Sequence, residues 1–124
     1  METKEWVDKL RGLPDDAIIQ LHFKLQDDIK RYYKLREEDN NLELAIMYCE
    51  QQIALAELTM PAMKSKHRRE AAEYKKITGM KSPVVFYAPA HHGYRQLIVI
   101  LKRRGDQQRI SELRRKRNRE GWHE

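Results

Sequence analysis

Apolar residues recur every seven positions between residues 18 and 63. One series runs Ile18, Leu25, Tyr32, Asp39, Ile46, Ile53 and Met60, and the other runs Leu21, Asp28, Leu35, Leu42, Cys49, Ala56 and Met63. Twelve of these fourteen positions are apolar, whereas the 40% hydrophobic content of the chain would place about six apolar residues there. The excess predicts long helices that pack on one another through an apolar stripe.

The charges beside this stripe indicate how the stretch folds. A parallel dimer of one long helix would set like charges together, such as Arg31 against Arg36. Folding antiparallel about residues 38–41 instead gives three compatible neighbours: Arg36 with Glu43, Ile29 with Glu50, and His22 with Glu57. The polar run at residues 38–41 favours a turn there. We predict an antiparallel, coiled-coil-like αα-hairpin over residues 14–60, with an antiparallel homodimer of unbroken helices as the alternative.

Proline and glycine divide the rest of the chain. A short helix is expected near residues 5–10, and Pro14 suits the first position of the next helix. Pro61 lacks a backbone donor, so we expect the helix either to kink or to restart there, with a basic helix over residues 61–78 that ends at Gly79. Residues 79–90 form an extended connector, and residues 84–87 read as a buried strap between two prolines.

The last third admits two interpretations. Residues 94–101 place apolar side chains at helical spacing, yet their Ile-Val-Ile run also favours a strand. We predict a helix, and the alternative is an α+β fold with a small β-hairpin at residues 84–101. Asp106 is suited to cap a final helix that runs to about Arg119, and Trp122 is expected to fold back onto a neighbouring helix.

The pattern Tyr94, Leu97, Ile98, Leu101, then Gly105, Asp106 and Ile110 resembles one degenerate tetratricopeptide-type repeat across residues 91–122, as in small bacterial or prophage helical proteins. The sequence departs from that repeat at Gln107 and Arg114, and it lacks the closing proline. The resemblance implies a C-terminal helical hairpin in a non-enzymatic protein that binds peptides or proteins. Taken together, residues 1–124 are expected to form a single all-α domain.

Composition limits the class of protein. Residues 1–60 hold 8 Lys or Arg against 13 Asp or Glu, whereas residues 61–124 hold 17 against 6. The basic half therefore predicts an anionic partner or complementary faces within an oligomer. A single cysteine excludes an intrachain disulfide, and neither a signal sequence nor a membrane-length apolar run is present. We expect a cytoplasmic protein that does not bind membranes and that can form a homodimer.

Basic residues gather at the C-terminus and form the leading candidate binding site. The predicted partner- or phosphate-binding residues are Arg103, Arg104, Arg109, Arg114, Arg115, Lys116, Arg117 and Arg119. A secondary basic face is expected from Lys64, Lys66, Arg68, Arg69, Lys75 and Lys76. Such a cluster can neutralise several phosphates, or it can dock on an acidic surface, including the acidic hairpin of the same chain.

Catalytic signals are weak. His91, His92 and Tyr94 could supply acid–base chemistry, but such histidines more often cap and pack a helix start. Cys49 on the apolar stripe reads as a core residue, and no cofactor motif or metal-ligand spacing is present. We predict a small non-enzymatic adaptor or regulatory protein, such as a phage or mobile-element accessory factor, that docks on an acidic or nucleic-acid-handling protein. The alternative is non-sequence-specific nucleic-acid binding through the Arg-rich C-terminal helix.

Overall fold

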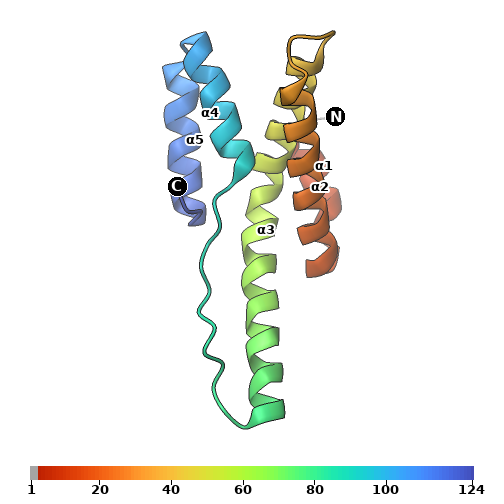
Figure 1. Ribbon diagram of the computed structural model, residues 1–124, viewed down its shortest axis with the longest axis vertical. Helices are drawn as coiled ribbons and strands as arrows, with labels where there is room; N and C mark the ends of the chain where they lie inside the picture. The colour runs from red at the N-terminus through yellow and green to blue at the C-terminus, as the bar shows by residue number, and fades with distance from the viewer. Residues whose placement is uncertain (1–2) are drawn as a thin grey trace.

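A computed structural model describes residues 3–124, which form five helices (Figure 1): α1 Thr3–Leu10, α2 Asp15–Lys34, α3 Asn41–Thr78, α4 His92–Arg104 and α5 Gln107–Glu120. This part of the chain contains no strand, and one isolated parallel bridge joins Ala90 to His123. The all-α prediction is confirmed. The alternative β-hairpin at residues 84–101 is wrong, because its second half is the helix α4.

Helices α2 and α3 pack side by side in opposite directions and are joined by residues 35–40 (Figure 1). Asp39 adopts a left-handed backbone conformation with φ of 46°, which short polar side chains tolerate better than most. The Asn41 side chain donates a 3.0 Å hydrogen bond to the Leu35 carbonyl and closes the turn. The alternative of one unbroken helix across this stretch is therefore wrong.

The glutamates beside the apolar stripe do not meet the neighbours that the sequence suggested. Each lies within ion-pair distance of an arginine from another element: Glu43 with Arg104 at 2.9 Å, Glu50 with Arg109 at 2.9 Å, and Glu57 with Arg11 at 3.2 Å. The acidic side of α3 therefore faces α4, α5 and the residue that follows α1. These pairings depend on where the other helices dock on α3. The heptad pattern gives no information about that docking.

Helix α3 continues through Pro61, so a new helix does not start at that residue and that part of the prediction is wrong. Proline removes one backbone hydrogen bond, which would otherwise be donated to the Glu57 carbonyl. Ala56, Met60 and Ala62 are buried on either side, so packing holds the helical backbone across the lost bond. The predicted basic helix at residues 61–78 is therefore the distal part of α3.

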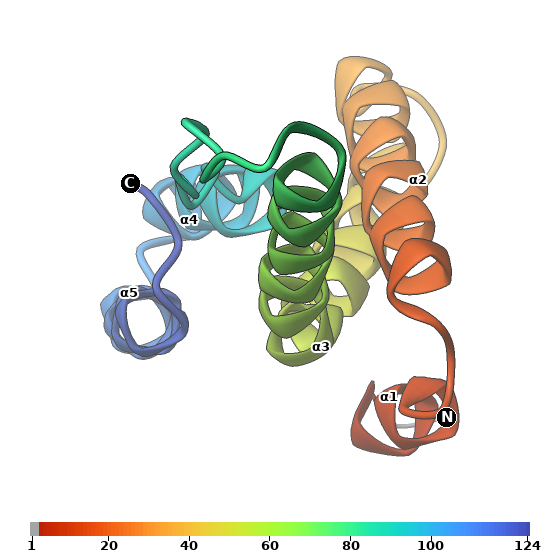
Figure 2. The same ribbon diagram turned by 90° about the horizontal axis from the view of Figure 1, so that it is seen from below.

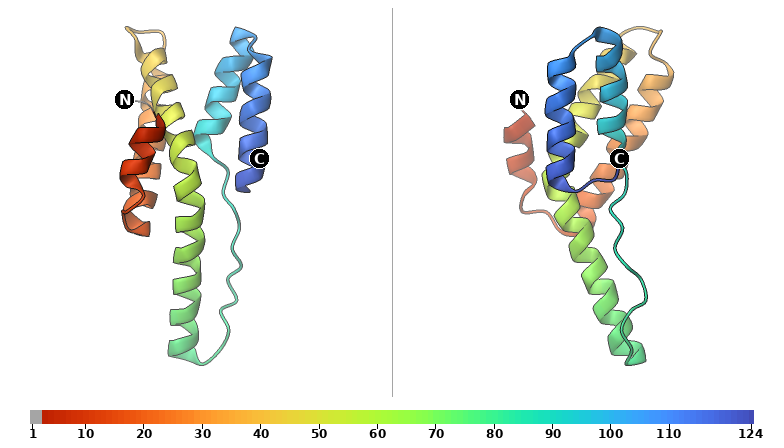
Figure 3. Two further views of the ribbon diagram at one scale, coloured as in Figure 1. Left: turned by 180° about the vertical axis from the view of Figure 1, so that it is seen from behind. Right: turned by 90° about the vertical axis from the view of Figure 1, so that its left-hand side faces the viewer.

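Helix α3 has 38 residues and α2 has 20, so α3 extends well beyond its partner (Figure 3). We name residues 63–90 the arm: it comprises the distal part of α3 and the connector that returns along it. The connector is extended as predicted, but it is not a buried strap, because Val84, Val85 and Tyr87 are exposed. Only Phe86 and Ala88 pack partly against the core, since the arm has no further layer to cover it.

The C-terminal hairpin of α4 and α5 packs on α3, and in Figure 2 α3 lies between this hairpin on one side and α1 and α2 on the other. The predicted return of Trp122 is confirmed: it is buried in the larger core cluster with Tyr94, Ile53 and Leu113. A smaller cluster joins α1, α2 and α3 around Leu25 and Leu55. Within residues 3–124, no helix combines the length and apolar character needed to cross a lipid bilayer.

Candidate functional site

Helix α5 is an outer element of the fold, and its two ends are well defined (Figure 2). The Asp106 carboxylate accepts a 3.1 Å hydrogen bond from the Arg109 backbone N–H and caps the start, as the sequence predicted. Gly121 ends the helix with φ of 85°, a conformation that favours glycine. With both ends fixed and about 100° between successive residues, each side chain of α5 belongs to a definite face.

The basic residues on the inner face of α5 form contacts within the chain. Arg109 pairs with Glu50, and Lys116 donates to the Ile53 carbonyl at 2.9 Å and to the Glu120 carboxylate at 2.6 Å. Arg117 is buried, with its guanidinium 3.5 Å from the Glu124 carboxylate. These side chains attach α5 to the rest of the fold and are not available to a partner.

The predicted C-terminal cluster therefore divides into two groups. The engaged residues, which contact other parts of the chain, are Arg104, Arg109, Lys116 and Arg117. The outward residues, which are exposed and form no ion pair within residues 3–124, are Arg103, Arg114, Arg115 and Arg119. Within the first group, Arg104 and Arg109 dock on the acidic hairpin, whereas Lys116 and Arg117 pair with Glu120 and Glu124 near the C-terminus. The second group is left for a partner.

Exposed residues of α5 form one continuous polar surface, which we name the outer face. Its members are Gln107, Gln108, Ser111, Arg114, Arg115, Asn118 and Arg119. They fall within about 140° of the helix circumference. The only acidic residues of α5 are Glu112 and Glu120, and they pair with Arg109 and Lys116 of the inner face. The outer face consists entirely of hydrogen-bonding side chains and carries positive charge without a carboxylate.

The secondary basic face lies on the distal part of α3. All six predicted residues, Lys64, Lys66, Arg68, Arg69, Lys75 and Lys76, are exposed. Arg69 reaches the start of α2, where its guanidinium lies 2.6 Å from the Asp15 carboxylate. A hydrogen bond from Ser65 and the contact with Arg69 lower the pKa of Asp15. Lys66 occupies a different side of the helix from the other five residues, next to Glu70 and Glu73.

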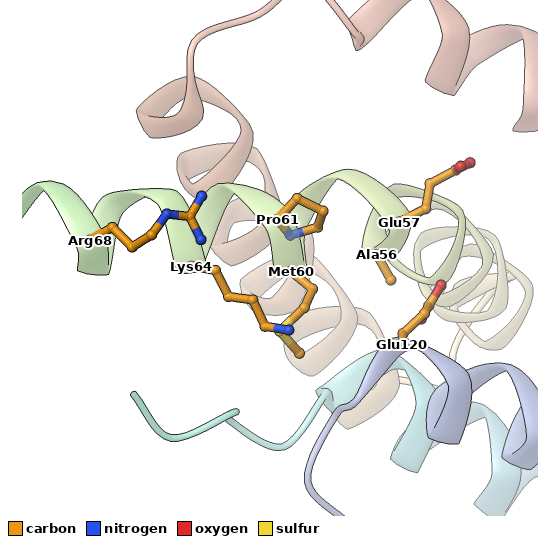
Figure 4. Close-up of a pocket in the computed structure, with 7 residues that line it drawn as sticks. All are labelled: Ala56, Glu57, Met60, Pro61, Lys64, Arg68 and Glu120. Carbon is orange, nitrogen blue, oxygen red and sulfur yellow. The ribbon is translucent and has the colours of Figure 1, made fainter. Parts of the chain in front are cut away.

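A pocket of about 400 Å³ opens where α3 passes the end of α5 (Figure 4). It is lined by Ala56, Glu57, Met60, Pro61, Lys64, Arg68 and Glu120. The Glu120 carboxylate already accepts hydrogen bonds from the Tyr94 hydroxyl at 2.6 Å, from Lys116 and from the Trp122 indole. The pocket therefore combines two cations, Lys64 and Arg68, with the carboxylates of Glu57 and Glu120 and a few apolar side chains.

The His91 side chain packs in the core and caps the start of α4. The His91 ring is buried, and its Nδ1 accepts a 3.2 Å hydrogen bond from the Tyr94 backbone N–H, which caps α4 as the capping interpretation predicted. Its Nε2 lies 3.2 Å from the Gln52 carbonyl, so the neutral ring donates there. Burial lowers the pKa of His91 to about 3 and that of His22 to about 4. Both rings are therefore uncharged at neutral pH.

Gln52 is the centre of this buried cluster, and the sequence did not identify it. Its side chain donates to the His22 carbonyl at 3.0 Å and accepts from the Gly93 backbone N–H at 2.8 Å. The Trp122 ring stacks on His22, with ring centroids 5.7 Å apart, and meets His91 edge-on. Gln52 is one of two consecutive glutamines, and nothing in the local pattern distinguishes it from its exposed counterparts.

Gly93 is held in close contact with this cluster, and its replacement tests the packing. A Cβ added at Gly93 would lie 2.6 Å from Gln52 Oε1, so we expect Gly93→Ala to lower the free energy of unfolding by about 2 kcal/mol. The clash outweighs the gain of up to about 1 kcal/mol that alanine brings to a helix. Urea denaturation followed by circular dichroism measures the change. Gly12→Ala is the control, because a Cβ there meets no atom within 4 Å; equal stability of the two variants would contradict the clash.

Potential metal ligands and the single thiol were compared with the requirements of a metal or thiol site. Within residues 3–124, no three His, Cys, Asp or Glu side chains are grouped to hold a metal ion. Cys49 is buried, and burial raises the pKa of its thiol to about 12. Comparison of the chain with protein-family models, curated proteins and solved structures finds no match. Function is therefore inferred from the geometry of the surfaces, and the outer face of α5 is the best-defined of them.

Proposed function

We propose that the protein binds nucleic acid, without reading its sequence, through the outer face of α5. The observation that carries the proposal is the composition of that face: three arginines, two glutamines, an asparagine and a serine, with no carboxylate. Arginine binds phosphate oxygens in a bidentate manner, and amide and hydroxyl side chains add hydrogen bonds to phosphate, sugar or base edges. An acidic protein surface would satisfy the arginines but makes less use of the four neutral residues.

The shape of α5 supports the same proposal. A helix with its side chains is about 10–12 Å across, and the major groove of duplex DNA is about 12 Å wide. Helix α5 is at the edge of the fold, with α3 and α4 packed on one side only. The outer face has the polar residues typical of a groove-bound helix, but its three arginines point to phosphate contacts more than to recognition of particular bases.

A salt titration tests this proposal. Binding to labelled duplex DNA and single-stranded RNA is measured by fluorescence anisotropy as the salt concentration rises. In the variant with Arg114, Arg115 and Arg119 changed to Ala, we expect the slope of log affinity against log salt to fall by about 3, because each lost phosphate contact removes about one released counterion. The matched control changes Lys9, Lys30 and Lys34 to Ala, which removes the same charge from exposed positions on α1 and α2.

The outcomes separate the two classes of partner. Absence of binding at low salt overturns the proposal, as does an equal fall in slope in the control variant. Poly-glutamate is the probe for an acidic protein. If it displaces DNA at equal charge concentration, docking on an acidic protein, as the adaptor prediction holds, replaces nucleic-acid binding as the function of the outer face.

A further inference from the structure

The heptad stripe of α3, whose members Ala56 and Met60 are buried in the core cluster with α4 and α5, continues into the arm, where the chain provides no helix to cover it. The seven-residue repeat passes from Met60 and Met63 to His67, Glu70, Tyr74 and Ile77. Helix α2 begins at Asp15, beside Arg69, so the last turns of α3 extend beyond it. Ile77 is 74% exposed, and every residue from 72 to 80 is exposed. A helix gains most of its stability from packing, so this bare stretch suggests a missing partner.

The connector covers a different side of α3. Phe86 packs on the His67 ring, with centroids 5.6 Å apart, and Val84 lies over Ala71 and Lys75. Tyr74 and Ile77 lie on the adjoining side, at helical positions rotated from Ala71 and Lys75 toward the α2 side. The connector therefore leaves this stripe open.

The stripe begins in a partly apolar groove, at the place where α2 and the connector approach α3. The groove is a hollow of about 280 Å³ lined by Ile19, Phe23, Met63, Lys66, His67, Glu70, Phe86, Tyr87 and Pro89. Two of its aromatic side chains are exposed, Phe23 to 46% and Tyr87 to 83%. The open stripe and the groove form one surface on the same side of α3.

The charges on this surface are balanced, in contrast to the rest of the arm. The basic residues Lys64, Arg68, Arg69, Lys75 and Lys76 fall on the opposite side of α3. The open stripe carries Lys66 against Glu70 and Glu73. It is therefore unsuited to a strongly charged partner of either sign.

We propose that the open stripe binds the same stripe of a second copy of this chain, with the two α3 helices antiparallel. Antiparallel packing about a two-fold axis near residues 68 and 69 brings together three complementary pairs, each occurring twice: Met63 with Tyr74, Lys66 with Glu73, and His67 with Glu70. Ile77 then meets the region of Met60 and the groove beside Phe23. Because the stripe is complementary to itself, a second copy of this chain is the partner that fits it.

The oligomeric state and a charge exchange test the pairing. We expect a particle of twice 14.9 kDa in analytical ultracentrifugation across a micromolar concentration series. Lys66→Glu places like charges opposite each other twice and is expected to weaken the dimer about tenfold. Adding Glu73→Lys restores the dimer by exchanging the charges. Lys76→Glu makes the same charge change on the other side of α3 and is expected to leave the dimer intact.

Engineered cysteines test the register. Residues 66 and 73 are about 10 Å apart along one helix, too far for an intrachain disulfide, but in the antiparallel pair each faces the other across the axis. We expect the variant carrying both Lys66→Cys and Glu73→Cys to form disulfide-linked dimers on oxidation, and Lys66→Cys alone to remain unlinked. Cys49 is buried and stays out of the exchange.

Three results would each overturn the pairing. A monomer at every concentration excludes it. A dimer that Lys66→Glu leaves unchanged places the interface elsewhere. Linkage of the single Lys66→Cys variant shows that the helices meet in another register or direction.

Discussion

Replacing Gln52 with alanine is expected to lower the free energy of unfolding by about 3 kcal/mol. The change leaves the His22 carbonyl and the Gly93 N–H buried without their partners, and each orphaned group costs about 1–3 kcal/mol. It also opens a cavity where α2, α3 and α4 meet. Urea denaturation followed by circular dichroism measures the loss.

Gln20→Ala is the matched control for Gln52→Ala, because Gln20 is exposed on α2. We expect its unfolding free energy to stay within about 0.5 kcal/mol of the wild type. If Gln52→Ala costs no more than this control, the buried glutamine does not hold the C-terminal hairpin in place. A larger loss that is confined to α4 and α5 in hydrogen exchange would show that the hairpin opens separately.

Acidification is expected to unfold the protein through His22 and His91. Both pKa values are lower in the folded state, about 4 and about 3, than the ordinary value of 6.5. Above pH 6.5 both states are neutral and these residues add no pH dependence. Between 6.5 and about 4 the unfolded chain binds protons that the folded chain excludes, so stability falls as pH falls. The loss is at most about 1.4 kcal/mol per pH unit for each histidine.

The physical cause is the environment of the two rings. Their centroids are 5.2 Å apart, so their charges would repel, and Nδ1 of His91 can accept the bond from Tyr94 only while it is unprotonated. His22→Phe keeps a ring beside Trp122 but removes one titrating group. We therefore expect the free energy of unfolding of this variant, measured with urea, to fall less steeply as the pH is lowered. The slopes of the variant and the wild type should differ by the contribution of about one bound proton. Equal slopes in the variant and the wild type would contradict a role for His22.

The candidate site was partly visible in the sequence. The basic C-terminal cluster could be identified from the density of arginines and lysines, and both the cap at Asp106 and the end of α5 before Gly121 followed local rules. The sequence did not indicate which basic residues of the C-terminal cluster point outward. Arg109 and Lys116 differ from Arg114 and Arg115 only in facing α3, and that depends on how the C-terminal hairpin is rotated against α3.

Local pattern determined the helices themselves: heptad spacing, turn-prone residues and capping side chains act over a few positions, so the sequence alone indicated an all-α chain, the turn before Asn41 and the return of Trp122. Tertiary structure decided whatever depends on neighbours distant in sequence. Packing carried α3 through Pro61, and burial of Gln52 made one of two adjacent glutamines central to the core. The lack of a covering layer left the connector exposed. In each case the deciding energy comes from contacts between elements, and these exist only once the elements have docked.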